Sequence, residues 1–284
     1  MKMINTVMLG AVVGDIVGSI YEFDNVKKTD FELFTSASRF TDDTVMTLAV
    51  ALWLTVDDKH SPEKLVNCMR GLGQRYPNAG YGGNFFRWLY CKTPRPYGSY
   101  GNGSGMRVSP VGLYAVTLEE ALKLAETTAR VTHDHPEGIK GAQAVAACMF
   151  LCRAGHSKKE IKEYVEKTFG YDLDRTIDAI RPGYTYDVSC QGSVPEAIIA
   201  FLEGDSFEEV VRLAVSIGGD SDTIACMAGA IASCLYTIPL DIAGRCDDTL
   251  TDELREIKDD FMYKVRARNS IVGHVIRFFR REMG

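Results

Sequence analysis

Apolar residues recur along most of the chain at the spacing of α-helices. Between Val45 and Leu54 nearly every residue is apolar and neither Gly nor Pro interrupts the run, which is typical of a buried helix. Ser61 followed by Pro62 marks the start of the next helix, because Ser caps helix N-termini and Pro fits the first helical position. No alternating run is bounded by hairpin turns, so strands are not expected. The pattern predicts an all-α fold.

The same reading divides the whole chain into helices and long loops. No low-complexity linker separates the elements, so we expect a single compact multi-helix domain over residues 1–284. The segments 23–40, 77–105 and 181–194 are expected to be loops, and loops of such length are often functional. Helices are predicted over about residues 5–22, 45–55, 61–76, 85–90, 109–114, 117–130, 137–153, 157–169, 176–180, 195–204, 206–217 and 224–236, with helical patterns over 247–260 and 264–281.

Composition narrows the class of protein. Of 284 residues, 46% are hydrophobic and 25% charged, as in ordinary globular proteins, and the formal net charge of −6 argues against a nucleic-acid surface built on overall charge. No apolar run approaches the roughly 20 residues that span a bilayer. The eight cysteines form no CxxC pair and most lie in apolar helical runs. We therefore expect a cytoplasmic protein with reduced cysteines, monomeric, and without nucleic-acid or membrane partners.

Two adjacent carboxylates stand at the start of the helix that contains Val45. The sequence there is Thr41-Asp42-Asp43-Thr44, and a single capping residue, worth about 1 kcal/mol, would satisfy the helix end. The second Asp is surplus to that role. A similar stretch, Gly218-Gly219-Asp220-Ser221-Asp222-Thr223, opens the apolar helix predicted from residue 224.

If these two helix N-termini meet, four carboxylates share one small volume. Two charges about 4 Å apart repel by roughly 4 kcal/mol at an effective dielectric constant of 20. The carboxylates must then be protonated or neutralised by cations. Aspartate and Thr oxygens, without His or Cys, suit Mg²⁺, Mn²⁺ or Ca²⁺ rather than Zn²⁺. The alternative is two independent capping motifs far apart in space.

The first predicted helix carries a polar stripe. Asp15, Ser19 and Glu22 fall on one face of an otherwise apolar helix. Glycines repeat at every fourth position of this helix and would let another backbone approach closely. Such a helix can line a site. Alternatively, Asp15 bonds a neighbouring helix end and Glu22 is exposed at the helix C-terminus.

Three further features suggest a ligand without requiring one. The glycine-rich segment 101–105 would let backbone N–H groups meet a ligand, although turns alone also explain it. His133 and His135 resemble a zinc pair but lack further ligands at fixed spacing, so capping or hydrogen bonding competes with that reading. Tyr184 or Tyr186 could stack on a nucleotide base, as could the aromatic residues between positions 81 and 97, which equally suit a folded surface loop.

Five motifs follow one another along the chain: Gly14-Asp15 through Glu22, Thr41-Asp42-Asp43-Thr44, Gly101-Asn102-Gly103-Ser104-Gly105-Met106-Arg107, Thr132-His133 and Gly219-Asp220-Ser221-Asp222-Thr223. In this order they resemble the ADP-ribosylglycohydrolase family, which includes the dinitrogenase reductase-activating glycohydrolases. The resemblance spans about residues 10–235. No motif is decisive alone, but the ordered set is specific.

The resemblance implies an all-α fold that holds a pair of Mg²⁺ ions between helix N-termini, with Mn²⁺ possible, and a hydrolase that releases ADP-ribose from a modified group. It implies Glu22 as the carboxylate that orients or deprotonates water, with Asp43 and Asp220 as further catalytic residues. The implied metal ligands are Thr41, Asp42, Asp43, Asp220, Asp222 and Thr223. The implied contacts to ADP-ribose are Gly101, Gly103, Ser104, Gly105, Met106 and His133.

Two alternatives stay open at this point. One is a non-catalytic relative that keeps the fold for ADP-ribose binding or a structural role. The other is a two-metal phosphoesterase acting on the diphosphate of a nucleotide. The leaving group on the ribose, whether arginine, serine, acetyl or base, is not determined by the sequence. The basic helical segment 264–281 is expected to pack its apolar stripe on the domain, the alternative being contact with a membrane or an acidic partner.

Overall fold

The described part of the chain is almost entirely helical, as the sequence predicted. The computed structural model describes the backbone of residues 7–282 and the side chains of residues 7–270. No strand occurs within these residues, where one isolated β-bridge pairs Gly101 with Ser189. The helices are α1 (Leu9–Gly18), α2 (Asp42–Val56), α3 (Pro62–Arg75), α4 (Gly83–Tyr90), α5 (Gly103–Met106), α6 (Ser109–Tyr114), α7 (Leu118–Arg130), α8 (Pro136–Arg153), α9 (Lys158–Phe169), α10 (Ile177–Ile180), α11 (Cys190–Glu203), α12 (Phe207–Ser216), α13 (Ser221–Ala232), α14 (Leu240–Thr249) and α15 (Asp252–Glu282).

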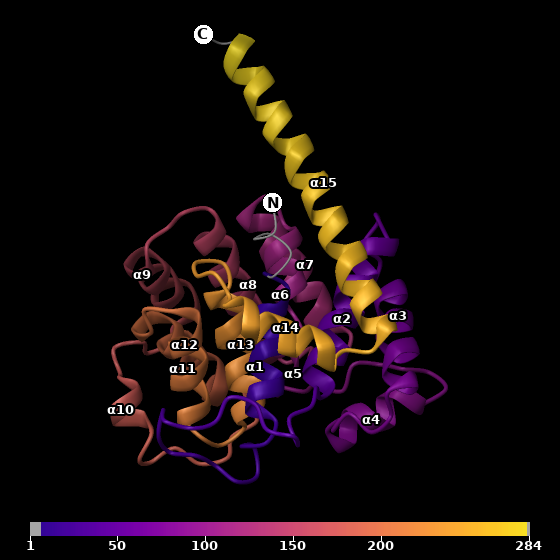
Figure 1. Ribbon diagram of the computed structural model, residues 1–284. Coiled ribbons are helices and arrows are strands. Elements are labelled where there is room, and N and C mark those ends of the chain that lie inside the picture. Colours follow the sequence, from indigo (N-terminus) through magenta and orange to yellow (C-terminus); the bar gives the residue numbers. More distant parts are fainter. Residues whose placement is uncertain (1–6, 283–284) are drawn as a thin grey trace.

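Helices α1 and α13, which come from opposite ends of the sequence, lie side by side at the centre (Figure 1). Their contact is lined by the glycines that the sequence suggested for a close approach. A Cβ atom built on Gly14 would lie 2.0 Å from the carbonyl oxygen of Ala225, and one on Gly18 would lie 2.4 Å from Cα of Asp222. Only glycine fits at these positions. The two backbones therefore touch, and Asp222 lies close to α1.

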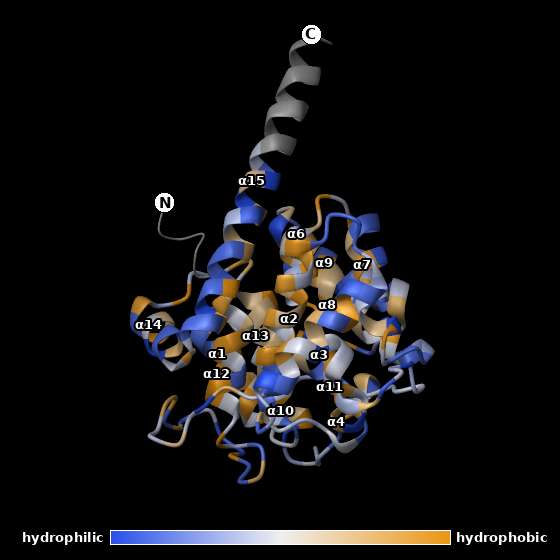
Figure 2. Cartoon of the chain, turned by 90° about the vertical axis from the view of Figure 1, so that its right-hand side faces the viewer, coloured by the Kyte–Doolittle hydropathy of each residue, from blue (hydrophilic) through white to orange (hydrophobic). Residues whose placement is uncertain are grey.

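The other helices surround this central pair. Helices α8, α11 and α12 pack on α13, while α2 packs on α3, α6 and α15. Hydrophobic residues gather on the central helices and hydrophilic residues on the outer surface (Figure 2). Residues such as Val12, Val50 and Ile224 have no exposed surface. The core thus fixes the N-terminal ends of α2 and α13 at one end of the central pair.

The long loop between α1 and α2 is tied to the start of α13. The side chain of Asn25 accepts a hydrogen bond from Gly219 N at 2.7 Å and donates to Gly219 O at 3.1 Å. Gly218 and Gly219 have φ values of +76° and +68°, which glycine adopts without strain. Arg212 of α12 donates to Phe31 O at 2.7 Å. The loop, predicted as a polar connection, is held against two helices.

Two helix boundaries near the site differ from the prediction. α1 ends at Gly18, so Glu22 lies in the loop and not on the helix. α11 begins at Cys190, earlier than predicted, because Ser189 caps it by accepting from Gly192 N at 3.1 Å. Pro195, predicted at the helix start, therefore lies within it.

The C-terminal helical patterns are divided at another position than expected. The acidic stretch 247–260 and the basic stretch 264–281 belong largely to one helix, α15, and the break comes at Leu250 and Thr251. Leu250 has extended backbone, and the Thr251 hydroxyl accepts from Leu254 N at 3.4 Å, which starts α15. The apolar stripe expected from residue 271 onward lies outside the described side chains.

None of the helices in the described range combines the length and apolar character needed to cross a membrane.

We expect Gly14→Ala to destabilise the fold, because the new Cβ atom would overlap the backbone of α13. Overpacking of this kind costs about 1–3 kcal/mol. The measurement is the free energy of unfolding from urea titration. Gly71→Ala is the matched control: it lies inside α3, where the nearest atom to the new Cβ is Arg75 Nη1 at 3.6 Å. That variant should gain about 0.5–1 kcal/mol from helix propensity. Equal stability of the two variants would contradict the tight contact.

Candidate active site

Asp15 holds the N-terminus of α2 against α1. Its Oδ2 accepts from Thr41 N at 2.9 Å and from Thr44 N at 3.1 Å, and the hydroxyl groups of both threonines donate to the same carboxylate. The side chain has no exposed surface. Asp15 therefore bonds a neighbouring helix end, the alternative that the sequence left open for this residue.

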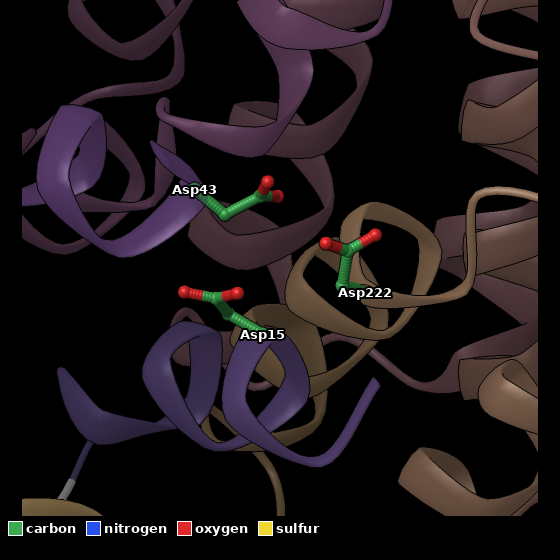
Figure 3. A group of neighbouring side chains, drawn as sticks. All are labelled: Asp15, Asp43 and Asp222. Carbon is green, nitrogen blue, oxygen red and sulfur yellow. The ribbon is translucent and has the colours of Figure 1, made fainter. Parts of the chain in front are cut away.

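The two aspartate motifs meet in space. The hydroxyl of Thr223 on α13 donates to Asp43 Oδ2 on α2 at 3.2 Å, and carboxylate oxygens of Asp15, Asp43 and Asp222 lie within 4.8 Å of one another. Figure 3 shows these three carboxylates pointing toward one another from α1, α2 and α13. The helix N-termini are thus joined and not independent caps.

A second acidic group shares Asp222 with the first. Carboxylate oxygens of Glu22, Asp220 and Asp222 also lie within 4.8 Å of one another. Asn102 donates to Asp220 Oδ2 at 2.6 Å, and the Tyr186 hydroxyl donates to Glu22 Oε1 at 2.9 Å. Glu22 and Asp220 are therefore each held by a neutral donor from another loop.

The cluster is short of positive charge. Within the described side chains no Lys, Arg or His forms a salt bridge with its carboxylates. Burial, followed by repulsion from neighbouring carboxylates, raises the pKa of Asp43 and Asp222 well above the ordinary value. Burial likewise raises the pKa of Glu22, against the Tyr186 hydrogen bond, and that of Asp220. Asp43 Oδ1 is buried without a hydrogen-bond partner in this part of the chain. Such an oxygen is suited to a cation.

The cluster forms one end of a cavity of 390 Å³. Asp42 lines this cavity but belongs to neither acidic group, and its pKa is raised to about 8 by burial and by the charges of Asp15 and Asp220. Other lining residues predicted from the sequence are Glu22, Thr41, Asp43, Gly101, Gly103, Met106, His133, Asp220, Asp222 and Thr223. The cavity therefore joins the acidic cluster to the glycine-rich segment.

Ser104 and Gly105, predicted as ligand contacts, lie behind the cavity wall. The Ser104 hydroxyl donates to Gly138 O at 2.7 Å, and a Cβ on Gly105 would lie 2.9 Å from the sulfur of Met227. Both positions pack the short helix α5 against α8 and α13. Their role as ligand contacts stays a prediction.

The remaining sequence alternatives are resolved by local contacts. His135 caps α8 by accepting from Glu137 N at 3.1 Å, and neither His133 nor His135 belongs to a group of potential metal ligands among the described residues. Tyr186 lines the cavity, and its ring stacks on that of exposed Phe23 with centroids 6.3 Å apart. The Tyr184 hydroxyl instead donates to Gly192 O at 2.8 Å.

Four residues of the site were not assigned from the sequence. Asp15, Asn102, Arg107 and Tyr186 contact other groups of the site and are not among the residues predicted as ligands or catalytic groups. Asp15, Asn102 and Arg107 belong to motifs that the sequence did mark, and Tyr186 was a candidate for stacking on a base; these were the available signals. Asn102 and Tyr186 act through pairings across 118 and 164 positions, which no local pattern reveals.

Comparison with known proteins identifies the family. The model of the ADP-ribosylglycohydrolase family matches residues 4–270. The chain therefore belongs to the ADP-ribosylglycohydrolase family, as its motifs indicated, and the predicted enzyme class, an ADP-ribosyl glycohydrolase, is that of this family.

Similar curated proteins share about a quarter of their residues with this chain. ADP-ribosylhydrolase ARH3 is 26% identical in Mus musculus, over 81% of this chain and 82% of that protein, and 27% identical in Homo sapiens, over 81% and 84%. ADP-ribosylarginine hydrolase Tri1 of Pseudomonas putida (strain GB-1) is 26% identical, over 81% of this chain and 70% of that protein. A solved structure described as an ADP-ribosylglycohydrolase-related protein complex has the same fold, with a TM-score of 0.68 at 24% identity, over 93% of this chain and 100% of that one.

We expect the metal-free protein to lose stability as pH rises. Because the cluster carboxylates have raised pKa values, the folded state binds more protons than the unfolded state. The contribution of these carboxylates to stability is therefore fully present below the ordinary Asp pKa of 3.8 and is lost as pH rises through the pKa of Asp42 at about 8. Urea unfolding in EDTA at several pH values in this range measures the fall, which Asp222→Asn should reduce.

Asp178→Asn is the control for that experiment. Asp178 is exposed and pairs with Arg181 away from the cluster, so this variant should keep the wild-type pH dependence. Two results would contradict the raised pKa values of the cluster. One is a wild-type free energy of unfolding that does not fall as pH rises. The other is the same dependence of this free energy on pH in Asp222→Asn as in wild type.

Proposed function

We propose that this protein is a divalent-cation-dependent hydrolase that releases ADP-ribose by cleaving the glycosidic bond at the anomeric carbon of an ADP-ribosyl group. One observation carries the proposal. Two acidic groups share Asp222, and all their residues except Asp15 line the same cavity as the glycine-rich segment. Membership in the ADP-ribosylglycohydrolase family supports it. The names of the similar proteins ARH3, an ADP-ribosylhydrolase, and Tri1, an ADP-ribosylarginine hydrolase, support ADP-ribosylated substrates.

The residues present fit a pair of hard divalent cations. The cluster offers carboxylate and hydroxyl oxygens, forms no salt bridge among the described side chains, and contains the buried oxygen Asp43 Oδ1, which has no hydrogen-bond partner there. Mg²⁺ is the proposed ion, with Mn²⁺ as the alternative. When bound, cations of this kind would lower the pKa of a coordinated water and orient the substrate. The proposed ligands are Thr41, Asp42, Asp43, Asp220, Asp222 and Thr223.

Asp15 is not among the proposed ligands, although it belongs to one acidic group. Both of its oxygens already accept hydrogen bonds from the N-terminus of α2. It would therefore set the position of Thr41 and Asp43 instead of binding an ion.

Glu22 is the proposed general base. It lines the cavity, and burial raises its pKa, which brings a carboxylate closer to the pKa that favours proton transfer near neutral pH. Positive charge builds up on the sugar ring as a glycosidic bond breaks, and the carboxylates of Asp43 and Asp220, which line the same cavity, are proposed to stabilise it. The chain thus supplies a base for water and an anionic surface for the developing charge.

The site combines helices from both ends of the chain, which supports the proposal of one domain over residues 1–284. The monomeric state, the cytoplasmic location and the lack of nucleic-acid partners stay predictions.

The direct test is incubation with arginine-, serine- and acetyl-linked ADP-ribose and identification of the product by mass spectrometry. We expect Mg²⁺-dependent release of intact ADP-ribose from at least one substrate and its loss in EDTA. Glu22→Gln should lower kcat by about 10²–10⁴, the usual contribution of a general base. Glu163→Gln, an exposed position on α9, is the control. AMP as product would instead identify a phosphoesterase, and activity after complete metal removal would exclude the proposed mechanism.

Tyr186→Phe tests how Glu22 is held. The Tyr186 hydroxyl donates to Glu22 and so favours the charged carboxylate, which lowers its pKa relative to the unbonded group. Removing the hydroxyl should raise the pKa of Glu22 and move the acidic limb of the kcat pH profile to higher pH. The ring, and its stacking on Phe23, is retained. Tyr100→Phe, an exposed tyrosine that does not line the cavity, should leave the profile unchanged. An unshifted profile in Tyr186→Phe would show that the contact does not tune the base.

A further inference from the structure

Arg107 is a buried cation without a carboxylate partner. It follows α5, lines the cavity and has no exposed surface. Its Nη2 donates to Thr128 O at 2.8 Å and to the Thr132 hydroxyl at 2.6 Å. Its Nε has no hydrogen-bond partner, and no Asp or Glu among the described side chains forms a salt bridge with it. A charge buried in this way is costly unless its surroundings compensate for it.

The end of α7 supplies part of that compensation. Thr128 lies in the last turn of α7, where free backbone carbonyl groups give the helix end a partial negative charge. The guanidinium also lies over the ring of Phe85, 5.9 Å from its centroid. Burial lowers the pKa of Arg107 to about 10, so the group stays charged at neutral pH. The cation is stabilised by dipoles and an aromatic ring, and its net charge is not cancelled.

Thr132 connects this cation to His133. The Thr132 hydroxyl lies 2.7 Å from His133 Nδ1, and both side chains are buried. Because Arg107 can only donate, Thr132 Oγ1 accepts from it. The hydroxyl proton then satisfies His133 Nδ1, which acts as the acceptor. The opposite arrangement, with Nδ1–H donating to Thr132, would leave the buried hydroxyl proton without a partner and is disfavoured.

This assignment places the imidazole proton on Nε2, which faces the glycine-rich segment. Nε2 would lie 3.2 Å from a Cβ on Gly103 and 3.6 Å from one on Gly101, and it has no hydrogen-bond partner in the described part of the chain. The His133 side chain lines the cavity. Burial and the nearby charge of Arg107 lower the pKa of His133 well below its ordinary value, so the ring is neutral.

We propose that Arg107 is a positioning residue that acts through Thr132, fixing His133 in the tautomer whose Nε2–H donates into the cavity. The acceptor is an oxyanion of the ligand, for which the diphosphate of an ADP-ribosyl group is the candidate. The identity of this ligand rests on the proposed function, whereas the hydrogen bonds from Arg107 through Thr132 to His133 are present in the protein without a ligand. The lining of the cavity then combines acidic groups with a fixed neutral donor, His133, that is backed by a buried cation.

The tautomer is measured directly by ¹⁵N NMR of the histidine side chains near neutral pH, with His133 assigned by its absence in His133→Gln. In wild type, we expect Nε2 to be protonated and Nδ1 to be unprotonated. Thr132→Val keeps the shape but removes the hydroxyl, and should give a mixture of tautomers, while Thr132→Ser should restore the wild-type spectrum. A proton on Nδ1 in wild type, or an unchanged spectrum in Thr132→Val, would overturn the proposal.

Calorimetric binding of ADP-ribose then tests the consequence. Thr132→Val should weaken binding by about tenfold, the effect of losing an aligned hydrogen bond to a charged group, and Thr132→Ser should bind as wild type does. Thr55→Val is the matched control, because it removes a helix hydroxyl, which donates to Ala51 O at 2.8 Å, at a position that neither lines the cavity nor belongs to the chain from Arg107 to His133. Equal weakening in both Val variants would mean a structural role only and would overturn the proposal.

The two experiments separate this inference from the proposed function. If wild type does not bind ADP-ribose, the proposed ligand fails, while the NMR result still decides whether Arg107 and Thr132 fix the tautomer. If binding and hydrolysis occur and the tautomer is mixed, the proposed function holds and the positioning role fails.

Discussion

The site depends on direct backbone contact between α1 and α13. Glycines at three successive turns of α1 remove the side chains that would otherwise separate the two helices, so Asp15 and Asp222 lie next to each other. Asp15 also accepts hydrogen bonds from Thr41 and Thr44 at the N-terminus of α2, so Asp43 lies beside Asp15 and Asp222. The contact between α1 and α13, together with the buried carboxylate of Asp15, therefore positions three helices around the acidic cluster.

This arrangement places unfavourable electrostatics at the centre of a well-packed core. The surrounding helices bury apolar residues completely, while the cluster holds several carboxylates without basic partners. A purely structural interior would avoid such groups, since buried unpaired charge is costly. Departures of this kind from good packing are typical of functional sites, where the rest of the fold supplies the lost stability.

Much of the fold could be predicted because its determinants are local. Ser61, Ser157 and Ser206 each cap a helix that the sequence placed correctly, and the glycine repeat of α1 indicated a close helix contact. The failures have a common cause. Ser189 caps α11, although the cap was expected nearer Pro195, and Thr251 caps α15 inside the acidic stretch. Each segment contains several residues that could cap a helix, and tertiary packing selects one of them. In the site, the aspartate motifs could be recognised, whereas the pairings of Asn102 with Asp220 and of Tyr186 with Glu22 could not, because the partners lie far apart in the sequence.

The β-bridge between Gly101 and Ser189 joins two loops that both line the cavity. Asn102 N donates to Val188 O and Cys190 N donates to Tyr100 O, each at 2.8 Å. Side chains add to this junction, because Cys190 Sγ donates to Gly101 O and Asn102 Nδ2 donates to Ser193 Oγ, each at 3.1 Å. The two loops are thus fixed to each other by main-chain and side-chain hydrogen bonds, so a substitution in one loop would also change the position of the other.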